Sequence, residues 1–371
     1  MTDFCVRRHG FAGTLGPKDN SESAGQAMVR RRDTRGAQSS RAIEMRVELA
    51  RMIAAHTSVE GDEVTPIPGL TLFRRTAPTT CTSAAYQPTL IVYAQGQKRI
   101  NVGGETYLCD GSTFQLTAVD LPVTSQVMRA SVEEPILALI LKLEMPVVRE
   151  ILSQEEFAAS EISTDTRGMV LGKTWVELLS ACCRLLDLLD TPEDIPFLGS
   201  LYKKEIVYRL LRSPQGKHLQ AIATVGEQSH RTARAVAWLR ANYAKPLRIE
   251  DLAAEARMGV STFHHHFRSL TSMSPLQFQK QLRLHVARQR MLNNGLDAAS
   301  AAFEVGYESA SQFNREYRRL FGQPPMRDIQ TLRLGINANA NNDGIDPNGQ
   351  RKRSLQNNRD VEPQSSKAAT G

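Results

Sequence analysis

The feature that most constrains this chain is a local pattern that occurs twice near its C-terminal end. In each copy, an alanine-rich segment with helical periodicity is followed by a short turn and then by a second helical segment with regularly spaced aromatic residues. The copies cover residues 249–270 and 298–321. Two short helices joined by a tight turn form a helix-turn-helix. The pattern therefore predicts two such units in an all-α domain at 228–334.

In the first copy, apolar residues at 249, 252, 253 and 256 lie on one face of a short helix, and acidic residues occupy its first turn, where the helix dipole favours them. The second helix buries Phe263, Phe267 and Leu270 at helical spacing. The same periodicity predicts four outward side chains that are candidates for reading a DNA groove: Ser261, His264, His265 and Arg268.

The second copy carries clearer helix-start signals. Asp297 and Ser309 are predicted N-caps on either side of a turn at Gly306. Phe313, Tyr317 and Leu320 form its predicted buried stripe. The outward face carries Ser311, Gln312, Arg315, Arg318 and Arg319. Glutamine and arginine can pair with adenine and guanine edges in the major groove, and the remaining arginines suit phosphates.

The charge distribution agrees with a nucleic-acid role for this region. Residues 230–334 hold sixteen Lys and Arg against eight Asp and Glu, whereas residues 57–150 hold seven against ten. A basic module on a mildly acidic one indicates that the C-terminal part meets a polyanion. A plain helical bundle explains the periodicity equally well, but not the duplication and charge together. Adjacent histidines on a helix point about 100° apart, so residues 264–266 are interpreted as helix surface and packing, and no metal site is expected.

The rest of the chain divides into an N-terminal domain and two tails. Residues 1–40 and 335–371 are predicted to be disordered, and residues 41–220 to form a domain of short strands followed by helices, so the fold class is α+β. An apolar seam at 178, 182, 185 and 189 packs either on the sheet or at a dimer contact. The chain has no predicted membrane span or secretory signal and only five cysteines, which favours a cytoplasmic protein.

The residues from 238 to 333 closely resemble the DNA-binding domain of the AraC/XylS family of bacterial regulators. The matching motifs are Gly306-Tyr307-Glu308-Ser309 through Gly322-Gln323-Pro324-Pro325, and Ser261-Thr262-Phe263-His264 with Met273-Ser274-Pro275-Leu276. The resemblance implies that bases are read by Ser261, His264 and His265 and by Ala310, Ser311, Gln312 and Arg315. Two positions depart from the family pattern, because Gly259 and Arg248 stand where helix-capping Ser or Thr is usual. The first unit is therefore expected to be the less stable one.

Residues 64–150 resemble the N-terminal domain of one AraC subgroup, through Thr65-Pro66-Ile67-Pro68-Gly69-Leu70, Gln95-Gly96-Gln97-Lys98 and Asp120-Leu121-Pro122-Val123. The resemblance implies a cupin-like β-barrel that senses a small-molecule effector or forms a homodimer, with RNA polymerase as a further partner if the protein is an activator. Candidate barrel-lining residues, each also explained by simple packing, are Tyr93, Gln95, Tyr107, Phe114 and Gln126.

Three alternatives remain at this point. A metal-dependent cupin enzyme fused to DNA-binding helices needs histidine ligands, and residues 57–217 contain none, so neither catalysis nor a cofactor is expected. A thiol-based redox or electrophile sensor would use Cys81 or Cys109, but no Lys or Arg lies within four residues of either to activate it. A nonspecific nucleoid binder would act by charge alone, and its binding would collapse steeply with salt.

Overall fold

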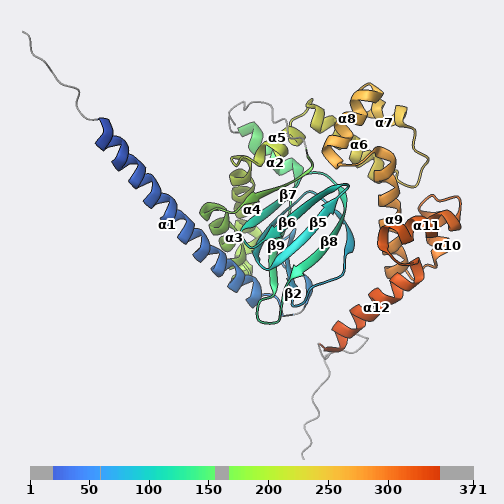
Figure 1. Ribbon diagram of the computed structural model, residues 1–371, viewed down its shortest axis with the longest axis horizontal. Coiled ribbons are helices and arrows are strands. Elements are labelled where there is room, and N and C mark those ends of the chain that lie inside the picture. Colours follow the sequence, from blue (N-terminus) through green and yellow to red (C-terminus); the bar gives the residue numbers. More distant parts are fainter. Residues whose placement is uncertain (1–19, 59, 155–166, 343–371) are drawn as a thin grey trace, which may run out of the picture.

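In the computed structural model, which describes residues 20–58, 60–154 and 167–342, two β-sheets are followed by a run of helices (Figure 1). All strand pairings are antiparallel. The first sheet has the order β1 (Gly61–Val64), β2 (Leu70–Arg75), β9 (Ile136–Lys142), β4 (Thr89–Gln95), β7 (Thr113–Thr117) and β10 (Met169–Lys173). The second has the order β3 (Thr82–Tyr86), β8 (Leu121–Arg129), β5 (Gln97–Val102) and β6 (Glu105–Asp110).

The two sheets face each other as a sandwich, and among the described strands no hydrogen-bonded ladder joins them. The α+β fold class is confirmed, but the sheets are open where a closed barrel was predicted. The consecutive strands β4 and β5 belong to different sheets and do not pair, and the chain passes from one sheet to the other at Gly96. Its φ of +79° is left-handed, and an added Cβ would come within 2.5 Å of Ile136, so only glycine can form this corner.

Strand alternation divides the first sheet into an inner and an outer face. Phe73 and Tyr93 face the second sheet: the Lys98 ammonium lies 4.7 Å from the Phe73 ring centre, and the Tyr93 hydroxyl lies near Cys109 of β6. Phe114 lies on the opposite face, where its ring meets Trp175 edge-on at 5.8 Å. Side chains of this one sheet therefore serve two separate layers of the core, one on each face.

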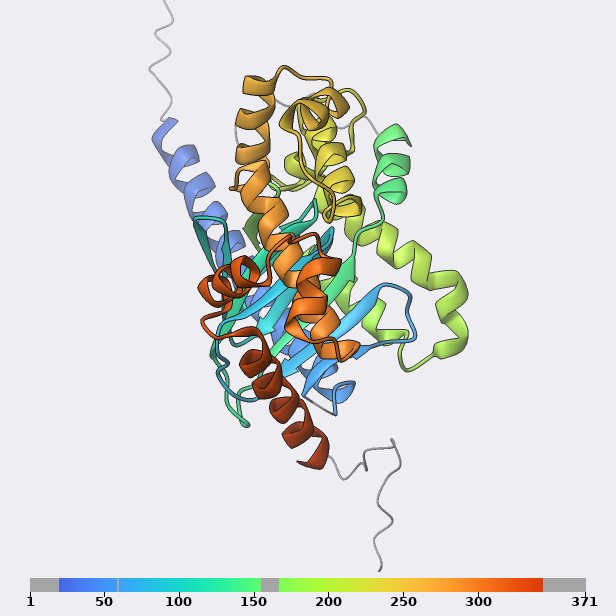
Figure 2. The same ribbon diagram turned by 90° about the vertical axis from the view of Figure 1, so that its right-hand side faces the viewer.

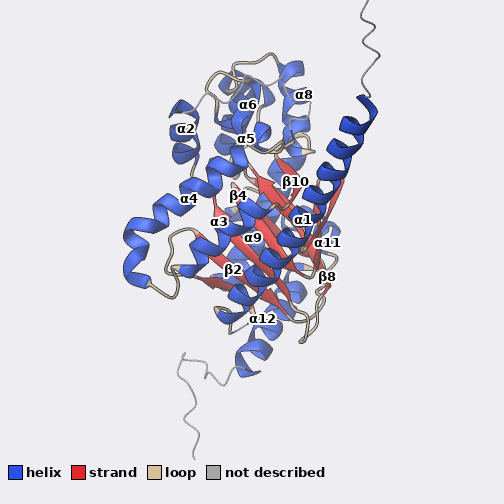
Figure 3. Cartoon of the chain, turned by 90° about the vertical axis from the view of Figure 1, so that its left-hand side faces the viewer, coloured by secondary structure: helices blue, strands red, loops and turns tan. Residues whose placement is uncertain are grey.

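Helices cover the outer face of the first sheet (Figure 3). They are α1 (Asn20–Ala55), α3 (Val176–Asp187) and α4 (Ile195–Leu211), with η1 (Pro192–Asp194) before α4; α2 (Met145–Gln154) and α5 (Gly216–Ala223) pack beside α4. The predicted seam is used within the molecule: Leu178, Cys182 and Leu185 are fully buried, and α3 packs between α1 and α4. The seam is therefore buried within the molecule, in the same hydrophobic core as the sheet residues.

The two tail boundaries predicted from sequence differ from the helix bounds in the structure. Residues 20–40 are part of α1, and residues 335–342 are part of α12, although both stretches were predicted to be disordered; residues 1–19 and 343–371 lie outside the described residues. No proline lies between residues 18 and 65, so the helix that buries Leu49 and Ile53 can extend toward its N-terminus. β10 also interrupts the helices that were expected to follow the short strands.

The C-terminal helices form the two predicted helix-turn-helix units, which lie at opposite ends of one long helix (Figure 2). Their bounds are α6 (Gln228–Ala241), α7 (Ile249–Glu255), α8 (Val260–Thr271), α9 (Pro275–Asn293), α10 (Ala298–Glu304), α11 (Ala310–Phe321) and α12 (Pro325–Asn342). The first unit belongs to the same hydrophobic core as the sheet domain, whereas the second has a core of its own. No helix among the described residues has the length and apolarity of a membrane span.

Candidate nucleic-acid interface

The orientation of α8 is fixed by aromatic side chains on its buried face. Phe263 and Phe267 are fully buried with ring centres 5.4 Å apart, and Phe267 meets Phe278 of α9 edge-on at 5.6 Å. Since the buried face is set by these contacts, the opposite face is presented to solvent. All four side chains predicted to point outward are exposed: Ser261, His264, His265 and Arg268.

In α11 the same arrangement is combined with caps at both ends. The Ser309 side chain accepts a hydrogen bond from the backbone N–H of Gln312, and Gly322 ends the helix in the left-handed conformation. Phe313 and Tyr317 are fully buried, while Leu320 is only half-buried. The outward face carries the exposed residues Ser311, Gln312, Arg315, Arg318 and Arg319, with Ala310 half-buried at its start.

Gln312 is exposed, but its side chain is hydrogen-bonded within the free protein. Its amide nitrogen donates to Glu316 at 3.3 Å, and the same carboxylate accepts from the Tyr307 hydroxyl at 2.7 Å and pairs with Lys280 at 3.0 Å. Burial favours a higher pKa for Glu316, but these hydrogen bonds outweigh it and hold the pKa below its ordinary value. Glu316 therefore orients Gln312 at the start of the exposed face.

Two groups of arginines in this domain differ in whether their side chains have an internal partner. Arg288 donates two hydrogen bonds to Asp328, at 2.7 and 2.8 Å, and Arg290 pairs with Glu304. Among the described residues, no hydrogen bond or ion pair engages the side chains of the outward-facing arginines, which are Arg268, Arg315, Arg318 and Arg319. Positive charge without an internal partner is what a phosphate-contacting face requires.

A third kind of arginine, missed in the sequence, connects the two units. Arg283 of α9 donates to the backbone carbonyl oxygens of residues 243, 244 and 245, which precede α7, and to that of Gly306 in the turn of the second unit. The four distances lie between 2.7 and 3.1 Å. Gln279 donates to two of the same carbonyls. Only the folded chain reveals this role, because the acceptors are backbone atoms distant in sequence.

The predicted effector-site residues of the N-terminal domain do not line one cavity. Tyr93 and Tyr107 are buried in the inner core, and the Tyr93 hydroxyl is 3.1 Å from the Gln115 amide oxygen. Phe114 lies on the outer face of the same sheet. Gln126 accepts from Arg99 at 2.6 Å, and Gln95 donates to the carbonyl of Pro135 at 2.8 Å. The strand alternation that sequence left undecided separates these side chains.

The cysteines differ sharply in exposure. Cys109, Cys182 and Cys183 are buried, and burial raises the pKa of the Cys109 thiol to about 12 despite the proximity of Lys98, its cross-strand partner. The sequence rule that no cation lies nearby therefore missed Lys98, but desolvation still keeps this thiol protonated. Cys81 is exposed. Among the described residues, no group of three or more His, Cys, Asp or Glu could hold a metal ion.

Two family descriptions match this chain. Residues 66–218 match the AraC-type transcriptional regulator N-terminus, and residues 252–330 match a helix-turn-helix domain.

Among curated proteins, the HTH-type transcriptional regulator ExsA of Pseudomonas aeruginosa is 31% identical over 153 residues, which are 41% of this chain. The chain thus spans 55% of the length of ExsA. The thermoregulatory protein LcrF of Yersinia pestis is 26% identical over 246 residues, which cover 64% of this chain and 88% of LcrF.

Two solved structures are also similar to this one. ToxT from Vibrio cholerae aligns with a TM-score of 0.48 and 10% identity, covering 70% of this chain and 97% of ToxT. The DNA-binding domain of AdpA, solved in complex with a target DNA, aligns with a TM-score of 0.27 and 29% identity, covering 28% of this chain and 94% of that domain.

Proposed function

We propose that the chain acts as a transcriptional regulator of the AraC family, which its two matched domains indicate, and that it binds duplex DNA sequence-specifically through α8 and α11. One observation carries the proposal. Both helices bury an aromatic stripe and present a polar, basic face whose arginines have no partner among the described residues.

The length of α9 supports simultaneous binding by both units. This helix has 19 residues and is therefore about 28 Å long. Successive major-groove segments on one side of DNA are about 34 Å apart. A unit at each end of α9 suits this spacing. In this proposal, bases are read by Ser261, His264 and His265 and by Ala310, Ser311, Gln312 and Arg315, and phosphates are contacted by Arg268, Arg318 and Arg319.

The test begins with selection of a preferred duplex from a random pool, followed by titrations at several salt concentrations. Arg315→Ala should weaken binding by about 1 to 3 kcal/mol and relax specificity at one base pair. Arg318→Ala should weaken all sequences alike and lower the salt slope by about 1. Arg51→Ala, on an exposed arginine of α1, is the matched control. Unchanged affinity in both α11 variants would exclude this face as the interface.

We assign the response to a small molecule to the N-terminal domain, since its folded sandwich lies outside the helices proposed to bind DNA. We propose an activating role because one relative is the virulence regulon transcriptional activator VirF of Yersinia enterocolitica. The chain is 30% identical to this relative over 51% of the relative's length. Activation would add RNA polymerase as a partner. The proposal includes no catalytic activity and places the protein in the bacterial cytoplasm, where the chromosome lies.

A further inference from the structure

The N-terminal domain has a pocket of about 720 Å³ that lies outside the inner core of the sandwich. It opens where the end of β10, the start of α3 and the end of α4 meet, and Lys173, Trp175, Glu177, Tyr208, Arg209 and Arg212 are among its lining residues. This volume is within the range of sites for small organic molecules. None of the effector candidates predicted from sequence lines it.

The pocket is electropositive. Three of its lining residues are cations and one, Glu177, is a carboxylate. Arg212 is exposed, and its guanidinium lies 5.8 Å from the centre of the Tyr208 ring with no carboxylate partner among the described residues. The Lys173 ammonium donates to the Ser112 hydroxyl at 2.8 Å and lies near Asp110, whose carboxylate already accepts two hydrogen bonds from Ser112. Arg212 and Lys173 can therefore bind an anion.

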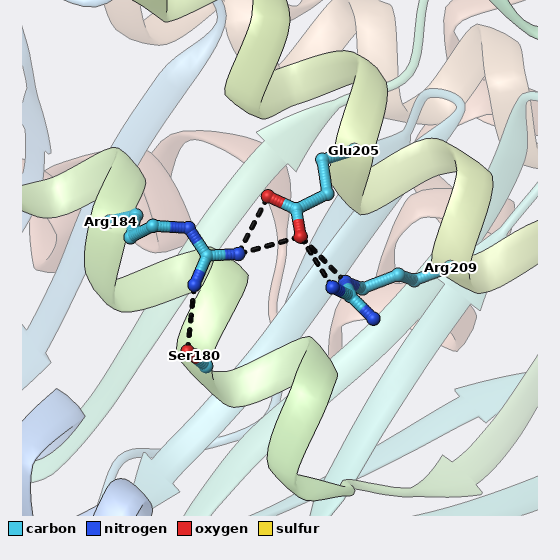
Figure 4. A network of polar contacts seen from close by, with 4 residues as sticks. All are labelled: Ser180, Arg184, Glu205 and Arg209. Atoms are coloured by element: carbon cyan, nitrogen blue, oxygen red, sulfur yellow. Dashed lines mark hydrogen bonds and ion pairs between the residues drawn. The ribbon is translucent and has the colours of Figure 1, made fainter.

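Arg209, the third cation of the pocket, is held in place by ion pairs with neighbouring side chains (Figure 4). Arg209 donates to Glu205 at 2.6 and 2.8 Å, and Arg184 of α3 donates to both oxygens of the same carboxylate at 2.6 Å. Burial favours a higher pKa for Glu205, but the two arginines outweigh it and hold the pKa below its ordinary value. This network fixes α3 against α4 and so keeps the pocket wall rigid.

Two aromatic side chains give the pocket a flat apolar surface. Trp175 is half-buried and rests edge-on against the fully buried Phe114, which fixes its position. Tyr208 projects from α4 beneath Arg212. Aromatic rings beside cations favour a ligand that combines a planar apolar body with a negative charge.

From this arrangement we propose that the pocket binds a small organic anion with a flat apolar body. Its charged group meets Arg212 and Lys173, and its body packs on Trp175 and Tyr208. The inference deepens the small-molecule response proposed above and rests on it for the regulatory consequence only. Pro214 and Gln215 line the pocket just before α5, α5 packs on α6, and α6 packs on α7 and α8. A bound ligand is thus separated from the first helix-turn-helix unit by two helices, α5 and α6.

The test uses the full chain with Trp238→Phe, which leaves Trp175 as the only tryptophan of the two in the sequence. The probe is 1-anilinonaphthalene-8-sulfonate, which accepts excitation energy from tryptophan, and its uncharged analogue N-phenyl-1-naphthylamine is the matched control. We expect saturable sensitised emission with the sulfonate and at least about 10-fold weaker binding of the uncharged analogue, because only the former makes charge-assisted hydrogen bonds.

Two charge-removing variants locate the probe. Arg212→Gln and Lys173→Gln should each weaken sulfonate binding about 10-fold, and Arg129→Gln, on an exposed arginine at the end of β8, should leave it unchanged. Equal affinity for both probes, or equal affinity of the sulfonate for all three variants, would contradict the proposal that this pocket binds an organic anion. DNA binding measured in parallel separates the two proposals, because loss of probe binding with intact DNA affinity concerns the pocket alone.

Discussion

In the second helix-turn-helix unit both helices begin with a side-chain cap and the chain turns at glycine, whereas the first unit has neither feature. Asp297 and Ser309 cap α10 and α11, while α7 and α8 begin at Arg248 and Gly259 without a side-chain cap. In both units, each helix is followed by a residue whose backbone has a left-handed conformation. These residues are Gly306 and Gly322 in the second unit and Arg257 and Ser272 in the first. Each non-glycine residue there costs conformational energy.

The first unit is supported instead by its surroundings. Its core is continuous with that of the sheet domain, the backbone N–H of Gly168 donates to the carbonyl of Leu270 at 2.7 Å, and Asp120 pairs with Arg240 of the adjoining α6. The second unit has a separate core, braced by Asp328, which accepts from Arg288 and from the Tyr317 hydroxyl. Local signals are thus strongest in the unit whose hydrophobic core is separate from that of the N-terminal domain.

The largest expected effect is that of Gly306→Ala. An added Cβ would come within 2.1 Å of the Ala244 carbonyl oxygen, at a φ of +89°. We expect a loss of about 2 to 4 kcal/mol in the free energy of unfolding, seen as faster amide exchange in α11. Arg257→Ala is the matched change in the first unit and should be nearly neutral, because a Cβ is already present there. Equal losses in the two variants would contradict the comparison.

Acid should weaken the second unit in particular. Burial lowers the pKa of His285, whose ring meets Phe321 edge-on, to about 4. The unfolded chain takes up this proton near pH 6.5 and the folded chain does not, so stability is complete above pH 6.5 and falls as the pH drops toward 4. Between pH 6.5 and 5 the loss should be about 2 kcal/mol. His285→Leu should flatten this part of a denaturation profile; an unchanged slope would mean that other groups cause it.

A smaller effect is expected from Asp297→Ala. Its carboxylate accepts from the backbone N–H groups of Ala299 and Ser300, at 2.8 and 2.9 Å. Loss of this cap should cost about 1 kcal/mol, confined to α10. The converse change, Arg248→Ser, should stabilise α7 by a similar amount, because it introduces a missing cap. Amide exchange in the first turn of each helix measures both, and a gain in α10 or a loss in α7 would refute the assignment of these caps.

The smallest expected effect is a gain from Arg257→Gly, of about 0.5 to 1 kcal/mol, since glycine adopts the left-handed conformation without a steric cost. The carbonyl of residue 257 accepts from Arg231, and this bond is independent of the side chain that is removed. Thermal unfolding monitored in the first unit provides the measurement. No gain would show that the φ of +52° at this position is not strained.

The same contrast explains what could be predicted from sequence. Local periodicity and caps predict where four helices start, at residues 249, 260, 298 and 310. They also predict the buried faces and the exposed residues of α8 and α11, and the structure agrees with these predictions. The missing caps at Arg248 and Gly259 were visible too, but the support that offsets them was not, because it comes from contacts such as Gly168 with Leu270.

Non-local features account for the errors. β10 is only five residues long and pairs with β7 across a separation of more than 50 residues, so no local pattern identifies it. The opposed faces of Tyr93 and Phe114 depend on strand register, and the cation beside Cys109 comes from the neighbouring strand. The anion pocket combines residues of β10, α3 and α4, which only the fold brings together.

The hydrogen bonds of Arg283 fix the orientation of the two helix-turn-helix units relative to each other. A single side chain joins the segment before α7 to the turn before α11, so rotation of one unit relative to the other would break several bonds at once. Each base pair inserted between two half-sites turns one of them by roughly 35° around the duplex axis. In the proposed binding mode the two units cannot follow such a rotation, so we expect the operators of this protein to keep a constant spacing between the two contacted segments.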